Sequence, residues 1–481
     1  MNTLDPLVCY TAFVARDRRF DGWFFMGVAS TGIYCRPICP ARTPLAKNCS
    51  FYSSAAAAER AGFRPCLRCR PELAPGHGVL DLSSGLAQAA ARLIEEGFLN
   101  GRNLAALADR VGITTRHLRR IFEAEFGVSM TEYTQTQRLL IAKRLLTDTQ
   151  MPITEVALAA GFGSVRRFNG LFLSQYGLNP LRLRKTSSAP SSDTLRFELS
   201  YRPPFAWHGV LAFLAHRQVR GVEHVGDDIY ARSIAFEHAG RQLAGWIRVE
   251  HAPLRHALEV TVSASLQSAI AQLLGRVRRL FDTHCRPELV DAHLGALAAD
   301  FPGMRVPGAV DGFEVAVRAI VGQQISVANA RVVLGRIAER FGSPIVDAPF
   351  GLRSAFPTAE AIAQLEAEDL ITTGLIRIRA EAIIAVAQEV ASGRIALEPL
   401  VPLEDTLAAL RRIRGVGEWT VQYIAMRALG WPNAFPEGDA VLKKHLGFTV
   451  TAALNEHASQ WAPWRAYATV HLWRQHEAAK S

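Results

Sequence analysis

Residues 410–444 contain a tight turn between two helical patterns, and this turn restricts how the C-terminal part of the chain can fold. The turn is Arg414-Gly415-Val416-Gly417, in which two glycines surround one apolar residue and allow the backbone to reverse sharply. The pattern after it predicts an amphipathic helix with apolar residues at Val421, Ile424, Ala425 and Leu429. We therefore expect two helices joined by a hairpin.

The hairpin is expected to leave backbone amides of the turn and of the next helix's first turn unpaired and pointing outward. Such amides suit a phosphate, because unpaired N–H groups and the helix dipole both favour an anion. A loop with Pro432 and Pro436 then leads to Asp439, before a helix rich in Lys443 and Lys444. The pattern thus predicts a carboxylate close to a phosphate-binding turn. The alternative is a surface helical hairpin in which Asp439 only caps a helix.

The length and composition exclude several classes of protein. A chain of 481 residues is too long for one core and predicts three or four domains. Its formal charge of +10 favours a polyanionic partner, because basic faces gain from releasing phosphate counterions. It has no apolar run long enough for a membrane span and no signal-peptide core, so we expect a cytoplasmic protein without a membrane partner.

Four of the seven cysteines form two closely spaced pairs, Cys35-x3-Cys39 and Cys66-x2-Cys69. In a reducing compartment this spacing predicts one tetrahedral four-cysteine Zn²⁺ site. Four unrelated reduced cysteines are the alternative. The other three have no such neighbours and are expected to be buried small residues: Cys9, Cys49 and Cys285.

Four thiolates around one Zn²⁺ carry a formal charge of −2, so their sulfurs stay electron-rich and nucleophilic. Nearby arginines are expected to attract a DNA backbone: Arg36, Arg42, Arg64, Arg68 and Arg70. The strings TGIYCRPICPART and FYSSAAAAERAGFRPCLRCRPE, within residues 24–72, resemble the metal-binding domain of the bacterial adaptive-response (Ada) proteins. This resemblance implies that Cys35 irreversibly accepts a methyl group from a methylphosphotriester in DNA. A purely structural zinc knuckle is the competing interpretation.

Residues 104–122 and 153–176 each carry a helix-turn-helix pattern, and a long helix over 137–146 is expected to join them. A glycine in each turn and basic residues early in each second helix suit a major-groove reading head. Those basic residues are Arg116, His117, Arg119 and Arg120, then Arg166 and Arg167. Phe168, Leu171 and Phe172 are expected to form a buried face. VALAAGFGSVRRFNGLFLSQYGLNPLRLR resembles the AraC-type signature, which implies sequence-specific binding; non-specific DNA docking is the alternative.

The Ser/Pro-rich stretch 185–194 predicts a linker, and the chain after it changes character. Alternating patterns predict strands at 195–201, 229–237, 242–250 and 256–263, with a helix at 207–217. Helices are expected to dominate from Leu266, including 314–320 and 327–341. YRPPFAW, YARSI, FEVAVRAIVGQQISV, IRGVGEWT and APWRAYATVHLW resemble 3-methyladenine DNA glycosylase II of the AlkA type over 195–481.

This second resemblance implies the roles of individual residues. Asp439 would stabilise an oxocarbenium-like sugar and orient the attacking water, and Trp419, Tyr423 and Trp473 would hold the extruded base. Gly415 and Gly417 would contact the DNA backbone. Gln324 stands where the family has the leucine that wedges into the duplex, which makes that role less certain.

Two absences limit the chemistry. Trp419 stands where related enzymes that also cut the backbone carry a lysine, so no Schiff base is expected. Cys285 is the only cysteine after Cys69, so no four-cysteine iron–sulfur cluster is expected in the second half.

The sequence therefore predicts a multidomain α+β protein with four domains. These are a zinc domain (1–75), an all-α double helix-turn-helix domain (84–185), an α+β subdomain (195–300) and an all-α helix-hairpin-helix glycosylase domain (301–481). The resemblances imply excision of alkylated purines of the 3-methyladenine and 7-methylguanine type. They also imply methyl transfer to Cys35 and promoter binding.

We expect a monomer with double-stranded DNA and RNA polymerase as partners. The Pro-Cys-His-Arg signature of the O6-methylguanine transferase domain is missing, so that activity is not expected. One alternative is a transcription regulator with an inert glycosylase domain. The other is a repair enzyme that uses the helix-turn-helix pair only for DNA affinity.

Overall fold

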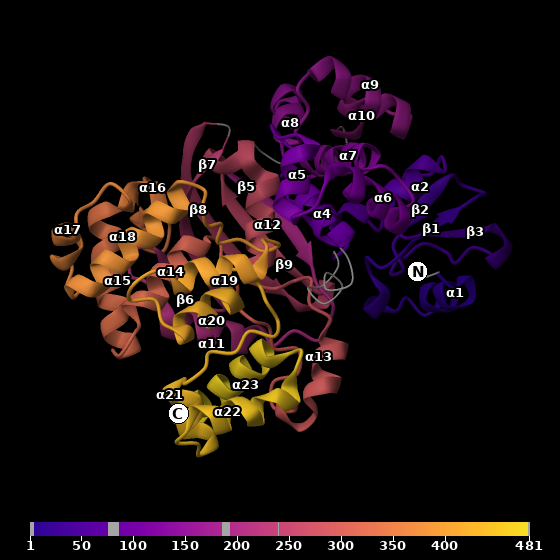
Figure 1. The fold of residues 1–481 in the computed structure, drawn as a ribbon. Coiled ribbons are helices and arrows are strands. Elements are labelled where there is room, and N and C mark those ends of the chain that lie inside the picture. The colour runs from indigo at the N-terminus through magenta and orange to yellow at the C-terminus, as the bar shows by residue number, and fades with distance from the viewer. Residues whose placement is uncertain (1–3, 76–85, 185–192, 239, 480–481) are drawn as a thin grey trace. The chain divides into compact units, whose positions relative to one another are not determined.

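The computed structural model describes residues 4–75, 86–184, 193–238 and 240–479 (Figure 1). The chain forms two compact units, which are described separately. The first comprises Met1–Pro203, Ala252–Gly275 and Thr283–Cys285. The second comprises Pro204–His251, Arg276–Asp282 and Arg286–Ser481. None of the described helices is long and apolar enough to span a membrane.

A small four-stranded sheet of order β3-β1-β2-β4 organises the N-terminal part of the first unit. β1 (Phe25–Val28) pairs antiparallel with β2 (Ile33–Cys35) and with β3 (Cys49–Tyr52), whereas β2 and β4 (Arg64–Pro65) are parallel. Two helices accompany the sheet, α1 (Pro6–Val14) and α2 (Ala55–Arg60). Because β2 and β4 run in the same direction, their carboxyl ends share one sheet edge, which brings Cys35 next to Cys66.

Over the described residues 86–184 the chain forms seven helices: α4 (Leu86–Glu95), α5 (Leu104–Val111), α6 (Thr115–Phe126), α7 (Met130–Asp148), α8 (Ile153–Ala159), α9 (Val165–Tyr176) and α10 (Pro180–Arg184). Two helix-turn-helix units, α5–α6 and α8–α9, are joined by α7, which is longer than the predicted 137–146. Thr114 and Ser164 cap α6 and α9 with their hydroxyls, which fixes where each second helix begins.

The predicted strands after residue 193 are present and are divided between the two units. β5 (Thr194–Ser200) pairs antiparallel with β9 (Ala257–Ser263) in the first unit, with Leu195 opposite Val262. In the second unit β7 (Ile229–His238) pairs antiparallel with β6 (Glu223–Gly226) and with β8 (Arg241–Ala252). β6 was not predicted, because it is too short to show alternation. Residues 185–192 of the predicted linker lie outside the described residues, and Thr194 already belongs to β5.

The rest of the chain is mainly helical, as expected. Its helices are α11 (Trp207–Arg217), α12 (Ile270–Leu280), α13 (Pro287–Leu294), α14 (Gly312–Val321), α15 (Val327–Phe341), α16 (Ala359–Ile362), α17 (Ala367–Ile371), α18 (Arg377–Ala391), α19 (Leu403–Arg411), α20 (Glu418–Arg427), α21 (Ala440–Leu446), α22 (Thr451–Ala458) and α23 (Arg465–Ala478). A minimal ribbon pairs β10 (Ser343–Pro344) with β11 (Ser354–Ala355). α14 packs against α18 and α20.

A buried ionic network holds α14 against the strands of the second unit. Arg318 contacts Glu223 and Glu314 at 2.6 Å each, and Arg232 contacts Glu314 at 2.6 Å. Burial opposes ionisation of Glu223, but the charges of Arg318 and Arg232 outweigh it and lower its pKa to about 2. Removing one partner of such a network leaves an uncompensated buried charge. The network thus fixes α14, which ends at Val321, just before Gln323 and Gln324.

Candidate functional site

Asp439 lies at the N-cap of α21 and is 8% exposed. Its Oδ1 accepts hydrogen bonds from the amides of Val441 at 3.0 Å and Leu442 at 2.9 Å. These amides belong to the unpaired donors of a helix N-terminus, where the helix dipole also favours a negative charge. Asp439 therefore caps α21, as the alternative interpretation predicted, and these hydrogen bonds hold its carboxylate in place.

Two indoles add to this cap. Trp419 Nε1 donates to Asp439 Oδ2 at 2.9 Å, and Trp473 Nε1 donates to Oδ1 at 3.2 Å. Among the described residues, Oδ1 therefore accepts three hydrogen bonds and Oδ2 accepts one. Oδ2 is the oxygen with acceptor capacity left for a further group.

Asp439 lines a cavity of about 1000 Å³ together with all three predicted pocket aromatics. Trp419 and Tyr423 stack with ring centroids 5.1 Å apart and an interplanar angle of 20°. Tyr423 and Trp473 are 6.2 Å apart and inclined by 42°. α20, α21 and α23 thus bring side chains separated by more than 50 residues to one cavity, and sequence reasoning named each of them. Trp461 and Trp464 are buried and do not line the cavity.

Cationic side chains in the same cavity were missed from the sequence. The Arg217 guanidinium lies 3.9 Å from the Phe213 ring centroid and 5.5 Å from that of Trp473. Arg427 donates to the Tyr423 hydroxyl at 2.8 Å. Burial opposes ionisation of Tyr423, but the charges of Arg427 and Arg217 outweigh it and lower the pKa of the phenol. Neither arginine stands in a motif, so only the fold reveals their position.

The hairpin before α20 differs in detail from the expectation. Gly415 has φ +92°, and a Cβ there would lie 3.1 Å from the Ala382 side chain, so this position requires glycine. Gly417 has φ −88°, and a Cβ there would meet no atom within 4 Å. The Val416 amide was expected to be unpaired, but it donates a hydrogen bond to the Ile413 carbonyl oxygen at 3.1 Å. Gly417 begins α20 without a side-chain cap, so the expected open helix start is present.

The turn after α14 reaches the hairpin. Gln323 donates through Nε2 to the Gly415 carbonyl and the Thr420 hydroxyl, each at 2.9 Å. The next residue, Gln324, is exposed, lines the cavity and has φ +53°. A positive φ at a residue other than glycine is uncommon and stores backbone strain. The turn therefore presents Gln324 at the rim of the cavity.

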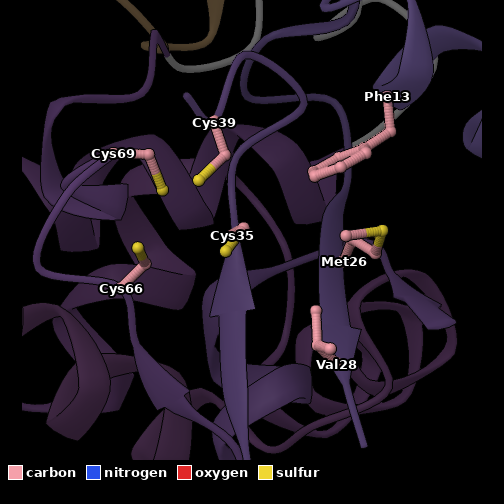
Figure 2. Packing of buried hydrophobic residues seen from close by; sticks show 7 residues of the cluster. All are labelled: Phe13, Met26, Val28, Cys35, Cys39, Cys66 and Cys69. Atoms are coloured by element: carbon pink, nitrogen blue, oxygen red, sulfur yellow. The ribbon is translucent and has the colours of Figure 1, made fainter. Parts of the chain in front are cut away.

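The four predicted cysteine ligands come together in the first unit. Their sulfur atoms lie within 4.8 Å of one another, all four residues are buried, and Figure 2 shows the sulfurs turned toward one common point. Hydrogen bonding to Cys39, Cys66 and Cys69, together with burial, raises the pKa of the Cys35 thiol. Thiols this close need a cation to become thiolates, and four sulfurs in this arrangement fit a tetrahedral Zn²⁺. The protein therefore has one Zn²⁺ site, held by these cysteines.

Two of the five arginines expected to attract DNA are engaged elsewhere. Arg36 is buried and pairs with Asp21, with Nε 2.9 Å from Oδ1. Arg70 contacts Asp148 at 2.7 Å and Glu72 at 3.1 Å. The expectation was wrong for these two, because the buried Asp21 holds Arg36, and the partly buried Asp148, with the neighbouring Glu72, holds Arg70.

The other three arginines, Arg42, Arg64 and Arg68, are exposed and line a cavity of about 610 Å³ that reaches Cys35 and Cys66. Of the remaining cysteines, Cys9 and Cys285 are buried as expected. Cys49 is only partly buried.

The basic helix-turn-helix residues are exposed, as the pattern predicts, but Leu171 is not buried as expected. Arg116, His117, Arg119 and Arg120 are exposed on α6, and Arg166 and Arg167 are exposed on α9. Phe168 and Phe172 are fully buried, whereas Leu171 is half-buried. Both second helices therefore keep their basic residues available to a ligand.

Four family models match successive parts of the chain. They are the metal binding domain of Ada (8–72), a helix-turn-helix domain (107–186), the AlkA N-terminal domain (196–311) and the HhH-GPD superfamily of base excision DNA repair proteins (317–457). The fold and the sites thus define a DNA-binding repair protein joined to a transcription-factor module.

The chain is similar over nearly its whole length to a probable bifunctional transcriptional activator/DNA repair enzyme AlkA of Mycobacterium tuberculosis. The two are 36% identical over 97% of this chain and 95% of the relative. DNA-3-methyladenine glycosylase 2 of Escherichia coli is 35% identical over 58% of this chain and 96% of that protein. The bifunctional Ada protein of Escherichia coli is 38% identical over 32% of this chain and 42% of its own length.

The chain therefore belongs to the family of bifunctional transcriptional activators and DNA repair enzymes of the AlkA type. It is a DNA-binding protein with DNA glycosylase activity, and it serves DNA alkylation repair and the regulation of that repair.

Proposed function

We propose that the C-terminal part of the chain releases alkylated purines of the 3-methyladenine and 7-methylguanine type from DNA by hydrolysis, with Asp439 as the catalytic carboxylate. The observation that carries this proposal is the buried Asp439 at one cavity with Trp419, Tyr423 and Trp473. The similarity to DNA-3-methyladenine glycosylase 2 supports the substrate class.

The proposed reaction begins when the damaged nucleotide leaves the duplex and its base enters the aromatic cavity. An alkylated purine carries a positive charge, which the π-faces attract, and this charge makes the base a good leaving group. The bond between C1′ and the base nitrogen breaks, and its electron pair leaves with the base. Asp439 Oδ2 then lies available to stabilise the positive sugar and to orient the water that adds to C1′. The proton lost by this water passes to solvent, and an abasic site remains.

The cavity also supports a purely hydrolytic route. No lysine is among its described lining residues, and by the family resemblance Trp419 stands where enzymes that also cut the backbone carry a lysine. A Schiff base between protein and sugar therefore has no nucleophile there. Gln324, exposed at the cavity rim, would fill the gap left by the extruded nucleotide, and Gly415 and Gly417 would receive the neighbouring phosphates.

We propose that Cys35 accepts the methyl group of a DNA methylphosphotriester. The Cys35 sulfur attacks the methyl carbon, the carbon–oxygen bond breaks, and its electron pair stays on the phosphodiester, which regains its negative charge. When bound by the four cysteines, Zn²⁺ would keep the Cys35 sulfur as an electron-rich thiolate. Cys35 and Cys66 both reach the 610 Å³ cavity beside Arg42, Arg64 and Arg68, whereas Cys39 and Cys69 do not line it. The resemblance to the Ada proteins selects Cys35 of the two.

The helix-turn-helix pair supports binding to a promoter through Arg116, His117 and Arg119 on one head and Arg166 and Arg167 on the other. Transcription activation would make RNA polymerase a partner. Because one chain carries both heads, a monomer suffices to contact two successive major grooves.

One reaction tests both proposed chemistries. The full-length zinc protein is incubated with methylated duplex DNA, released bases are measured by chromatography, and the peptide with Cys35 is measured by mass spectrometry. We expect free 3-methyladenine and 7-methylguanine, and a gain of one methyl group on Cys35. Methylated Cys35 without base release would favour a regulator with an inert glycosylase domain. Base release without methylation of Cys35 would indicate that the zinc site is a purely structural knuckle. A footprint on promoter DNA then separates a regulator from a repair enzyme that uses these heads only for affinity.

A further inference from the structure

A second basic cavity, of about 580 Å³, lies between the two helix-turn-helix units of the first unit. Both helix-turn-helix motifs contribute to its lining, which includes Thr115 of α6, Thr131 of α7 and Leu171 of α9. Because α7 packs against the helices on either side of it, the cavity is part of one helical body.

Four arginines line this cavity, and the described lining residues include no carboxylate. Arg102 precedes α5, Arg119 lies on α6, Arg138 on α7 and Arg167 on α9. None of them forms an ion pair with an acidic residue within the described part of the chain. Four cations from separate elements thus converge without an anion to balance them.

The contacts of these arginines are with neutral groups. Arg138 donates to the Leu99 carbonyl at 2.8 Å and to Asn100 Oδ1 at 3.3 Å, and Arg102 lies 4.6 Å from the Phe98 ring centroid. Burial, and then the charge of Arg167, lower the pKa of the Arg138 guanidinium. The like charges therefore oppose one another in the free protein, and an anion between them would relieve this repulsion.

We propose that this cavity binds the phosphodiester backbone of the DNA segment between the two recognition sites, with Arg102 and Arg138 as phosphate contacts. Two heads that read successive major grooves are separated by one helical turn, about 34–36 Å. The DNA between them presents its minor groove, flanked by two phosphate strands, to the protein. Arg119 and Arg167 belong to the heads, whereas Arg102 and Arg138 add charge only where these strands pass. Such contacts fix register and add affinity without reading sequence.

The experiment uses the full-length zinc protein and a duplex selected by it from a random pool, so that no operator needs to be known. Arg138→Gln and Arg102→Gln are compared with Arg182→Gln, an exposed arginine of α10 that does not line the cavity. Affinity is measured at several salt concentrations on the selected duplex and on a scrambled one. We expect each cavity variant to bind both duplexes more weakly by the same factor. The slope of log affinity against log salt concentration should fall in magnitude by about one. Arg182→Gln should leave the slope unchanged.

Neutral methylphosphonate linkages then locate the contact. Placed between the two protected major grooves, they should lower the affinity of the wild-type protein for the duplex by about fivefold per contact at 0.15 M salt. This factor corresponds to the release of one counterion. Arg102→Gln, whose side chain is exposed and whose loss spares the hydrogen bonds of Arg138, should lose about fivefold less affinity than wild type on this DNA, because only the Arg138 contact remains to be lost.

Equal losses for wild type and Arg102→Gln would place the contact elsewhere and overturn the proposal. Unchanged duplex affinity of both variants would also overturn it. If inorganic phosphate at constant ionic strength still raises the wild-type melting temperature in that case, the cavity is a site for a free anion.

Discussion

Trp419 Nε1 lies 2.9 Å from Asp439 Oδ2, so one of the proposed base-contacting rings also orients the proposed catalytic carboxylate. Trp473 makes the corresponding contact with Oδ1 at 3.2 Å. The walls of the cavity and the carboxylate are therefore one hydrogen-bonded assembly. A substitution that displaces either indole would therefore also remove one hydrogen-bond donor to the Asp439 carboxylate.

Asp439→Asn should reduce base excision by several powers of ten. Loss of a preorganised charge typically costs about 3–4 kcal/mol or more. Asparagine is as good an N-cap as aspartate, so α21 and DNA binding should persist. Single-turnover release of 3-methyladenine, with duplex binding measured alongside, checks this. Glu437→Gln is the matched control, because Glu437 does not line the cavity. Excision at the wild-type rate by Asp439→Asn would disprove the assignment.

The product of excision should be an intact abasic site. No lysine lies among the described lining residues of the cavity, so we expect no covalent adduct between protein and sugar. Borohydride should therefore trap no protein–DNA complex from the wild-type enzyme, and the strand should break only after alkali. A trapped adduct in good yield would contradict the hydrolytic mechanism.

The two hairpin glycines should behave differently. Gly415→Ala forces a side chain into φ +92° against Ala382, and should cost about 1 kcal/mol or more of unfolding free energy. Gly417→Ala meets no neighbour and fits its backbone, so its stability should be near that of wild type while duplex affinity falls. Thermal unfolding and anisotropy titration measure the two effects. Normal DNA affinity of Gly417→Ala would mean that no phosphate approaches this turn.

Methylation of Cys35 should raise affinity for promoter DNA. It converts a thiolate into a neutral thioether and changes the formal charge of the zinc site from −2 to −1, so repulsion of phosphates falls. We expect a gain of about 1–3 kcal/mol, or about 5- to 150-fold in affinity. The same preparation is titrated before and after reaction with methylphosphotriester DNA, because Cys35→Ala also removes a ligand. Equal affinities at low salt would leave the site without a regulatory role.

Glu59 should make the stability of the first unit depend on pH. Burial raises its pKa from 4.5 to about 8, although Thr136, Tyr34 and Lys143 oppose this shift. The folded protein then holds a proton that the unfolded chain loses, so stability falls as pH rises from 4.5 to about 8. Glu59→Gln should stabilise the protein above pH 8 by up to about 5 kcal/mol, since each pKa unit corresponds to about 1.4 kcal/mol. The two proteins should denature alike at pH 4.5. A difference independent of pH would indicate a packing effect.

Features that depend on local spacing could be predicted from the sequence alone. The cysteine pairs, the strand alternation after residue 193 and the paired helix-turn-helix patterns are properties of neighbouring residues, so each is visible without a fold. The glycine and aspartate spacing around Asp439 also identified the carboxylate, and the resemblance named the aromatic rings around it.

Which side chains meet across distant elements became visible in the fold and could not be read from local patterns. Folding brings Asp21 to Arg36 and Asp148 to Arg70 from other parts of the chain. These two arginines are therefore paired and are not available to bind phosphate as expected. Arg217 reaches the aromatic cavity because α11 packs beside it, although no motif marks that residue. Local patterns fix the backbone, whereas ion pairs and cavities arise from packing between elements that the sequence separates by tens or hundreds of residues.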